Sequence, residues 1–313
     1  MDLSKKRVLV TGGAGFLGRY VVEALQSKGC SEVFVPEHRE YDLTKSEVIK
    51  EVFRLSKPDV VIHMAAVLGG IGAHVNTQGQ FLYGNLVMGL EMMEQARDKV
   101  EKYVSIGTAC SYPEFAPVPL RAESIWEGFP NEVTAPYGIA KRVMLLQGQY
   151  YREQYGFNAV SVIPTSVYGP RDATSIEKSH IIPAQIRSCL EAKKSGKPLT
   201  VWGTGKATRD FIYATDCAEA IVKVVESYDK PEPLNLGSGV ETPIRDIIGM
   251  IVKDLDFKGK IVWDASKPEG NRTRSFEVSK AWEEVGFKVT TPLSEGIKRT
   301  IDWYTNENSN SVY

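Results

Sequence analysis

The sequence lacks several features that would place the protein in other functional classes. Its 38 basic and 39 acidic residues leave a net charge of −1, so no overall field attracts nucleic acid or an anionic membrane. No apolar run approaches the roughly 20 residues needed to cross a bilayer, and the first residues show no secretory signal. The four cysteines form no CxxC pair and the four histidines have no ligand spacing, which predicts neither disulfides nor a metal site. We therefore expect a cytoplasmic protein that binds anionic ligands through local Arg or Lys clusters.

Apolar segments alternate with helix-like segments through the first half of the chain, which is typical of a parallel α/β sheet. Strands are expected at 7–10, 32–35, 60–64, 103–106, 159–163, 234–236 and 260–263. Helices are expected at 16–28, 45–56, 81–97, 137–155 and 216–225, the last with Asp216 near its N-cap. The sequence thus predicts a Rossmann-type doubly wound sheet (1–170 and 211–239) and a smaller α/β substrate-binding lobe (171–210 and 240–313).

A glycine-rich loop follows the first predicted strand and leads into the first helix, Thr11-Gly12-Gly13-Ala14-Gly15-Phe16-Leu17-Gly18. Here Gly12 allows a tight turn, Gly15 lets the backbone approach a pyrophosphate, and Gly18 allows the helix to pack close to the sheet. The N–H groups of the first helical turn, which contains Phe16 and Leu17, then face the phosphates. We expect a dinucleotide to bind at this loop.

The end of the second predicted strand bears on the choice of coenzyme. An acidic residue there binds the free ribose 2′-hydroxyl of NAD, whereas an Arg binds the 2′-phosphate of NADP. Both Glu37 and Arg39 are present, so this segment leaves the coenzyme open. Asp42 and Leu43 could meet the adenine edge, although Asp42 fits a helix N-cap equally well.

Small residues follow the third predicted strand, in His63-Met64-Ala65-Ala66. Ala65 and Ala66 leave room for the adenosine of a dinucleotide that lies across the strand ends. His63 is expected to have a structural role.

Tyr137 and Lys141 lie four residues apart, on one face of the helix predicted at 137–155. An ammonium next to a phenol favours the phenolate, so Lys141 is expected to lower the pKa of Tyr137 from its usual value near 10 and to hold the coenzyme ribose. Tyr137 can then transfer a proton to or from a sugar hydroxyl while hydride moves to or from C4. Thr108, after the preceding strand, can donate to the substrate oxygen, with Ser111 as a weaker substitute.

The Thr, Tyr and Lys set and the G-x-x-G-x-x-G spacing resemble the extended short-chain dehydrogenase/reductase family, in its sugar-nucleotide branch. Nearly the whole chain is similar to the GDP-L-fucose synthases (GDP-4-keto-6-deoxymannose 3,5-epimerase-4-reductases) of that family. This second resemblance is carried by segments 69–71, 110–113, 135–141, 164–170, 179–184, 201–205, 209–211 and 264–270. Thr108-Ala109-Cys110 lacks the two acids of the family's sugar 4,6-dehydratases, which excludes water elimination.

The resemblance implies that Cys110 and His180 form the acid/base pair that epimerises C3 and C5 beside a C4 ketone. Inversion next to a carbonyl needs a base on one face and an acid on the other, and thiol and imidazole groups both titrate near neutrality. Hydride then reduces C4, with Tyr137 as the proton donor. The resemblance also implies that His180, Pro164 and Val167 contact the coenzyme.

The resemblance further implies a site for a nucleotide-diphosphate sugar, GDP-linked, in the smaller lobe. Trp202 could stack on the base, and the planar guanidinium of Arg209 suits a diphosphate. Arg187 is implied as a phosphate contact and Glu269 as a ribose or base contact.

Two segments depart from the family pattern. The family's NADPH enzymes usually carry Arg in the glycine loop and after the second strand, where this chain has Gly-Ala (13–14) and Pro-Glu (36–37). The resemblance implies NADP, and this departure leaves NAD as the alternative. Residues 116–134 also differ, which keeps open a related GDP-6-deoxy-sugar or heptose epimerase/reductase. A separate alternative is a nucleotide-sugar 4-epimerase that recycles bound NAD without net reduction.

Members of the family commonly form homodimers through the two long helices, here predicted at 81–97 and 137–155. The apolar residues Leu86, Met88, Leu90 and Met93 suit such an interface. A helix that faces the core of its own chain would show the same pattern.

Overall fold

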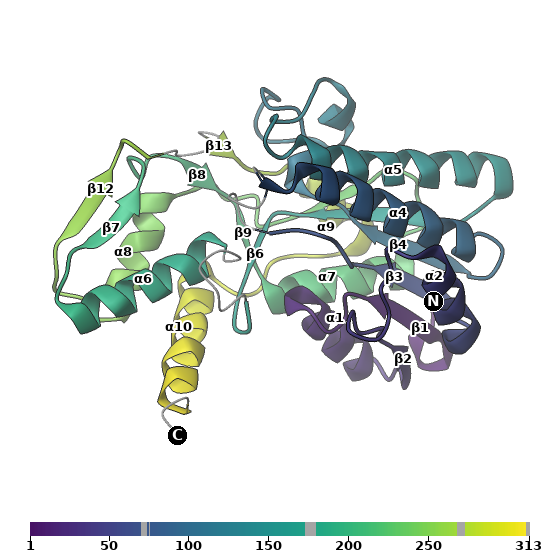
Figure 1. The fold of residues 1–313 in the computed structure, drawn as a ribbon, viewed down its shortest axis with the longest axis horizontal. Helices are drawn as coiled ribbons and strands as arrows, with labels where there is room; N and C mark the ends of the chain where they lie inside the picture. The colour runs from purple at the N-terminus through teal and green to yellow at the C-terminus, as the bar shows by residue number, and fades with distance from the viewer. Residues whose placement is uncertain (70–73, 75, 173–179, 268–272, 311–313) are drawn as a thin grey trace.

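The computed structural model describes residues 1–69, 74, 76–172, 180–267 and 273–310 (Figure 1). Its largest sheet has six parallel strands in the order β2-β1-β3-β4-β5-β10. These are β1 (Arg7–Thr11), β2 (Glu32–Phe34), β3 (Val60–His63), β4 (Lys102–Ile106), β5 (Ala159–Pro164) and β10 (Leu234–Leu236). The predicted parallel α/β sheet is confirmed.

Helices cover both faces of this sheet (Figure 1). One face carries α2 (Ser46–Ser56), α4 (Gln78–Ala96) and α5 (Ala135–Tyr155), and the other carries α1 (Phe16–Ser27), α7 (Ala214–Ser227) and α9 (Ser279–Val285). Along β1, Val8 and Val10 belong to the core under α1 and α7, whereas Leu9 belongs to the core under α2 and α4. Successive positions in the middle of β1 are therefore apolar on both faces rather than on alternate ones, as expected for a sheet buried on both sides.

The strand order reverses between β1 and β3, because the chain leaves β1 for β2 on one side and returns to β3 on the other. Open α/β sheets bind ligands at such a switch point, outside the carboxyl ends of the strands. The glycine loop follows β1 at this place, and the segments after β3, β4 and β5 share the same edge because all these strands are parallel. The fold thus brings the sequence-predicted motifs together.

A second hydrophobic core lies beside the large sheet, at the left of Figure 1. It is built by α6 (Ile181–Ser195), α8 (Ile244–Asp254), α10 (Leu293–Asn310) and the parallel pair β7 (Leu199–Trp202) and β12 (Ile261–Asp264). A small sheet, β11 (Thr242–Pro243), β8 (Thr208–Arg209) and β13 (Thr273–Arg274), adjoins it, and β6 (Ser166–Tyr168) pairs with β9 (Phe211–Tyr213). Within the described residues, no helix combines the length and apolar character that a membrane crossing requires.

Asp216 lies near the start of its helix, as expected, but neither Asp216 nor Asp42 is an N-cap. Helix α7 begins at Ala214 after Tyr213, so Asp216 lies inside its first turn, where it accepts hydrogen bonds from Thr290 and Thr291 instead. Asp42 does not cap α2, because its carboxylate accepts hydrogen bonds from the backbone and hydroxyl of Thr44 in the preceding turn. In both places the carboxylate accepts hydrogen bonds from N–H and O–H groups that do not belong to the first turn of the helix.

Helix α4 buries part of the apolar stripe that the sequence offered as a dimer contact. Met88 and Met93 belong to the core between α4 and the sheet, together with Met92. Leu82 and Tyr83 of the same helix are exposed. The sequence pattern did not separate the residues of α4 that face the sheet from those that face outward.

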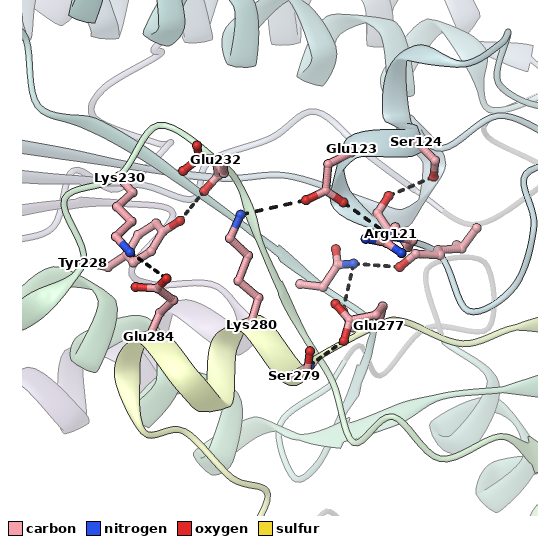
Figure 2. A network of polar contacts seen from close by, with 12 residues as sticks. Arg121, Glu123, Ser124, Tyr228, Lys230, Glu232, Glu277, Ser279, Lys280 and Glu284 are labelled. Carbon is pink, nitrogen blue, oxygen red and sulfur yellow. Dashed lines mark hydrogen bonds and ion pairs between the residues drawn. The ribbon is translucent and has the colours of Figure 1, made fainter.

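Residues 112–134 leave the end of β4, contain the short helix η3 (Ala122–Trp126), and return to α5. Leu120 exchanges backbone hydrogen bonds with Ser275 and Glu277, at 2.8 and 2.9 Å. Figure 2 shows the polar contacts around this junction, which include the ion pair of Lys280 with Glu123 at 3.8 Å. The segment between β4 and α5 is therefore held by the residues just before α9 and by the start of that helix.

Candidate active site

The glycine loop lies directly against the end of β3. Gly12 has a φ of 72°, and a Cβ atom added there would lie 2.8 Å from the backbone nitrogen of Ala65. The Thr11 hydroxyl oxygen accepts hydrogen bonds from Met64 and Ala65 N–H, both at 3.2 Å. A Cβ atom at Gly18 would lie 2.1 Å from the carbonyl oxygen of Gly12. The loop, the first helix and the end of β3 are therefore so close together that a side chain at Gly12 or Gly18 would clash with backbone atoms.

The N-terminus of α1 suits a phosphate. Its N-cap is Gly15, which offers no side-chain cap, and the first turn contains no acidic residue. The unpaired N–H groups and the positive end of the helix dipole therefore face outward. Leu17 packs against the core and Phe16 lies edge-on to Tyr20, with ring centroids 5.9 Å apart, so Phe16 and Leu17 offer their backbone to a ligand. This end of α1 fits the pyrophosphate of a dinucleotide.

Glu37 and Arg39, after β2, pair with each other. The Arg39 Nε atom lies 3.0 Å from the carboxylate of Glu37 and 3.6 Å from that of Glu40, and the Arg39 side chain is 75% exposed. Asp42 is engaged by its own turn, and the Leu43 side chain is buried in the core under α2, which leaves its backbone for an adenine contact. A coenzyme 2′-phosphate would compete with Glu37 for Arg39.

The other residues expected at the coenzyme lie along the same carboxyl edge. Ala65 and Ala66 follow β3 and are partly exposed. Pro164 ends β5, and Val167 lies in β6 and packs against the core of the large sheet.

Thr108, Cys110, Tyr137 and Lys141 meet where β4 ends against α5. Thr108 is the N-cap of the 3-10 turn η2 (Ala109–Ser111), and its hydroxyl oxygen accepts the Cys110 N–H at 3.2 Å. The same hydroxyl hydrogen-bonds the phenol of Tyr137. Tyr137 and Lys141 are buried one turn apart in α5, with the Lys141 Nζ atom 5.9 Å from the centroid of the phenol ring. The predicted Thr, Tyr and Lys set is therefore assembled next to the thiol.

Helix α5 packs very closely on η2. A Cβ atom at Gly138 would lie 2.1 Å from the carbonyl oxygen of Cys110. The Ser111 hydroxyl donates to the carbonyl of Gly138 at 3.1 Å, which leaves it unavailable as a donor to substrate. Buried Arg142 donates from Nε to the Ser111 carbonyl at 2.6 Å and from Nη1 to the Gly128 carbonyl at 2.8 Å. These contacts fix the turn that carries the thiol against the helix that carries the phenol.

Burial dominates the electrostatics of this helix. It lowers the pKa of Lys141 from 10.5 to about 8. The expectation that Lys141 lowers the pKa of Tyr137 is wrong for the protein by itself: burial raises the pKa of the phenol, the Cys110 charge adds to this, and the Thr108 hydrogen bond opposes it. Within the described residues the Lys141 ammonium has no hydrogen-bond or ion-pair partner, so it is free to meet ribose hydroxyls.

His63 lies beneath this cluster and is fully buried. Burial, with a smaller contribution from the charge of Lys141, lowers its pKa from 6.5 to about 3. Its Nδ1 atom lies 2.8 Å from the Thr11 hydroxyl. A permanently neutral imidazole that supports the glycine loop matches the structural role expected for it.

His180 is the N-cap of α6, and its side chain is 57% exposed. Its Nδ1 atom lies 3.0 and 3.1 Å from the two carboxylate oxygens of Asp172. Burial lowers the pKa of His180, but the hydrogen bond and charge of Asp172 outweigh it, so the net direction is upward. The sequence analysis missed Asp172, whose only sequence signal is its position next to the Tyr-Gly-Pro segment.

The expected substrate residues lie on the smaller sheets and on α6, which contains Arg187. Trp202 ends β7 with more than half its surface exposed, and the Nζ atom of Lys267 lies 5.9 Å from its ring centroid. Arg209 in β8 is aligned with Arg274 in the neighbouring parallel strand β13. Sequence reasoning missed Arg274.

Glu269, the remaining expected substrate residue, lies outside the described residues. Gly70 and Ile71 of the glycine motif after β3, and Ser179 next to His180, also lie outside them. In the described part of the chain, no group of three or more His, Cys, Asp or Glu side chains is placed to hold a metal ion.

Comparison with known proteins identifies the family. The sequence profile of the NAD dependent epimerase/dehydratase family matches residues 8–237. The chain belongs to this family. A GDP-L-fucose synthase from Sinorhizobium fredii is 37% identical over 306 residues, which cover 97% of each chain. The resemblance inferred from the motifs is thereby confirmed.

Solved structures agree with this membership of the epimerase/dehydratase family. The GDP-L-fucose synthetase of Naegleria fowleri bound to NADP has a TM-score of 0.90 at 27% identity, covering 97% of this chain and 95% of that one. A GDP-6-OMe-4-keto-L-xylo-heptose reductase from C. jejuni also has a TM-score of 0.90, at 25% identity, covering 97% and 99% of the two chains. The Rossmann-type fold class is therefore confirmed.

Proposed function

We propose that this protein is an NADP-dependent epimerase/reductase like the GDP-L-fucose synthases. Its substrate is a GDP-4-keto-6-deoxy-sugar, which it epimerises at C3 and C5 and then reduces at C4. The observation that carries this proposal is the close contact between η2, with Cys110, and α5, with Tyr137 and Lys141. The same unit thus supports two groups. The thiol of Cys110 transfers protons at the carbons beside the ketone, and the phenol of Tyr137 protonates the oxygen that is reduced.

Epimerisation uses proton transfer at carbons made acidic by the C4 ketone. Cys110 and His180 act as base and acid, one on each face of the sugar ring. The enolate oxygen that forms at C4 is stabilised by hydrogen bonds from Thr108 and Tyr137, which already lie together in the structure.

Reduction takes place at the same C4 oxygen. The nicotinamide coenzyme supplies the hydride when bound, and the glycine loop and the uncapped N-terminus of α1 fit its pyrophosphate. Tyr137 donates its phenolic proton to the oxygen that becomes the hydroxyl. The buried ammonium of Lys141, which has no partner among the described residues, would hold the coenzyme ribose.

The nucleotide-sugar occupies the lobe formed by 171–210 and 240–313, and the coenzyme occupies the domain formed by 1–170 and 211–239. Trp202 stacks on the base, and Arg209 and Arg187 bind the diphosphate. The alignment of Arg274 with Arg209 adds a second guanidinium on the neighbouring strand, which supports this placement. Glu269 completes the site with a ribose or base contact.

The protein acts as a homodimer in the cytoplasm. Exposed Leu82 and Tyr83 on α4 and exposed Tyr150 and Tyr155 on α5 support an interface along these two adjacent helices. The four free cysteines support a reducing compartment. Sedimentation equilibrium of wild type and of Tyr83→Glu tests the dimer, since a wild-type monomer would contradict it.

The decisive experiment supplies GDP-4-keto-6-deoxymannose with NADPH or NADH and identifies the product by NMR. We expect stoichiometric loss of absorbance at 340 nm with NADPH and a product inverted at C3 and C5. A nucleotide-sugar epimerase without net reduction would change the sugar with no loss of absorbance. In D₂O, Cys110→Ser is expected to lose exchange at C3 and C5, and normal exchange in this variant would contradict the epimerase assignment.

A related GDP-heptose epimerase/reductase is the second candidate. Residues 112–134 expose Phe115, Trp126 and Phe129, an aromatic segment directly after the catalytic turn. If this segment borders a larger sugar, a GDP-4-keto-heptose will give the higher kcat/KM in the same assay.

A further inference from the structure

Asp172 is a buried carboxylate that the mechanism above does not use. Its side chain is 2% exposed, and its oxygens lie 3.0 and 3.1 Å from Nδ1 of His180. From this geometry we infer that Asp172 is a positioning residue, which holds the His180 imidazole protonated at Nδ1 and leaves Nε2 as the atom that exchanges protons with the sugar. The inference rests on the proposed function, because it concerns how the same His180 works.

Asp172 is fixed by two helices that are distant in the sequence. The Tyr304 hydroxyl of α10 donates to the Asp172 carbonyl oxygen at 3.0 Å. From α1, the Tyr20 hydroxyl donates to the carbonyl of Pro170 at 2.8 Å, and Glu23 pairs with Arg171. The carboxylate is thus built into a rigid part of the fold and can serve as a reference point for another side chain.

His180, by contrast, is held mainly through Asp172. Its backbone carbonyl is fixed by the N–H of Ala184 at 3.0 Å, in the first turn of α6, but its imidazole is more than half exposed. The hydrogen bonds of the ring itself go to the Asp172 carboxylate. Among the described residues, Asp172 is the hydrogen-bond partner of the ring, and an exposed imidazole takes its orientation and its tautomer from such a buried partner.

The charge of Asp172 also sets the proton affinity of the ring. It raises the pKa of His180 against the effect of burial. Among the described residues, the ionisable groups near Asp172 include Tyr20 from α1 and Tyr304 from α10, with Arg171 next to Tyr20 and Arg187 of α6 next to Tyr304. The Asp172 carboxylate thus shifts the protonation equilibrium of the ring towards the imidazolium.

The proton balance follows from this arrangement. Cys110 takes a proton from the sugar carbon, and the imidazolium gives the proton on Nε2 to the opposite face of the enolate. The ring is then neutral, with its remaining proton on Nδ1 hydrogen-bonded to Asp172. Because more than half of the ring is exposed, Nε2 regains a proton from water, and the Cys110 thiol returns its proton to water, which restores the starting state.

The direct test is NMR of the histidine side chains, which is practical because the chain has only four. The His180 signals are assigned with His180→Asn, and its tautomer and pKa are read from ¹H–¹⁵N correlations in wild type and in Asp172→Asn. Asparagine keeps an acceptor oxygen at the same place but removes the charge. We expect the Nδ1–H tautomer in both proteins and a pKa that falls below the wild-type value in the variant. An Nε2–H tautomer in wild type, or an unchanged pKa, would overturn the inference.

Isotope exchange provides the functional readout. The rate of exchange at C3 and C5 is followed in D₂O as a function of pH, and the alkaline limb should move to lower pH in Asp172→Asn. Asp172→Ala, which removes the orientation as well, should slow exchange by roughly 10- to 100-fold. Hydride transfer to a keto-sugar already inverted at C3 and C5 should stay near the wild-type rate in both variants.

Controls separate this inference from the proposed function and from misfolding. Asp216→Asn removes a similarly buried carboxylate that only binds Thr290 and Thr291, and should leave the pH profile unchanged. If His180→Asn exchanges normally, the proposed function fails. If His180→Asn loses exchange while both Asp172 variants keep the wild-type rate and pH profile, the inference alone fails. NADPH titration verifies that each variant is folded.

Discussion

The buried ammonium of Lys141 leads to a prediction in which stability and activity move in opposite directions. Burial lowers its pKa from 10.5 to about 8. At 1.36 kcal/mol for each pKa unit, this corresponds to about 3 kcal/mol of instability for the charged form in the protein without coenzyme. Lys141→Met should therefore abolish reduction of the keto-sugar yet raise the free energy of unfolding of the coenzyme-free protein by up to about 3 kcal/mol at neutral pH.

Lys102 provides a comparison, because burial also lowers its pKa but, unlike Lys141, its ammonium has partners that oppose this effect. Its Nζ atom lies 2.9 Å from the carbonyl oxygens of Val224 and Val225 and 2.9 Å from the carboxylate of Asp229. Truncation leaves buried acceptors without a donor, at a cost of about 1–3 kcal/mol. Lys102→Met should thus destabilise the protein, while Lys141→Met stabilises it.

Urea unfolding of the two variants at several pH values measures both effects. The folded-state pKa of Lys141 lies below its unfolded value, so the unfolded chain binds more protons between about pH 8 and 10.5. Wild-type stability is therefore penalised below pH 8 and recovers as the pH rises through this window. The advantage of Lys141→Met should disappear over the same range. A Lys141→Met protein that is less stable than wild type at neutral pH would refute the reasoning.

Three further predictions concern the same site. Thr108→Val removes the hydroxyl that interacts with the Tyr137 phenol and should lower kcat for hydride transfer by about 10²- to 10³-fold. Thr108→Ser keeps a hydroxyl and should retain most of the wild-type kcat. Equal losses in the two variants would contradict a role of the Thr108 hydroxyl in hydride transfer. Arg39→Ala should raise KM for NADPH about tenfold, or 1.4 kcal/mol, without changing KM for NADH. Glu37→Gln, which removes the competing carboxylate, should lower KM for NADPH. If Arg39→Ala changes the KM of both coenzymes equally, Arg39 is not the phosphate contact. Arg142→Met loses two charge-assisted hydrogen bonds, one of them to the Ser111 carbonyl, and should lower the free energy of unfolding in urea by about 3 kcal/mol. The variant should slow exchange at C3 and C5 more than hydride transfer. Exchange at the wild-type rate would show that Arg142 does not position the thiol.

Much of the fold could be predicted because its signals are local. Continuous apolar strands and the helices between them define the sheet, and the glycine loop marks the turn after β1. Neither Asp216 nor Asp42 caps the helix beside it, because a carboxylate accepts hydrogen bonds from any N–H or O–H within reach. For Asp216 those donors come from residues more than seventy positions away, which no local pattern reveals.

The site residues likewise divide into those with a signal in the sequence and those without one. Tyr137 and Lys141 were found because helical periodicity places them on one face, and Cys110 and His180 were found because known relatives share the motifs around them. Asp172 was missed because its contact with His180 depends on the tertiary structure, and no sequence pattern shows that contact. The direction of the Tyr137 pKa was wrong because burial, which sequence spacing does not show, exceeds the effect of a neighbouring charge.

Helix α1 has a consequence for protein engineering. Its N-terminus fits the coenzyme pyrophosphate, while Tyr20 and Glu23, one and two turns later, hold the segment that carries Asp172. A sugar-binding lobe grafted onto a different dinucleotide domain would lose these two anchors, even if every residue that touches the sugar were transferred. Chimeras that exchange substrate specificity should therefore carry Tyr20 and Glu23 with the donor lobe, and those that omit them should bind both ligands but epimerise slowly.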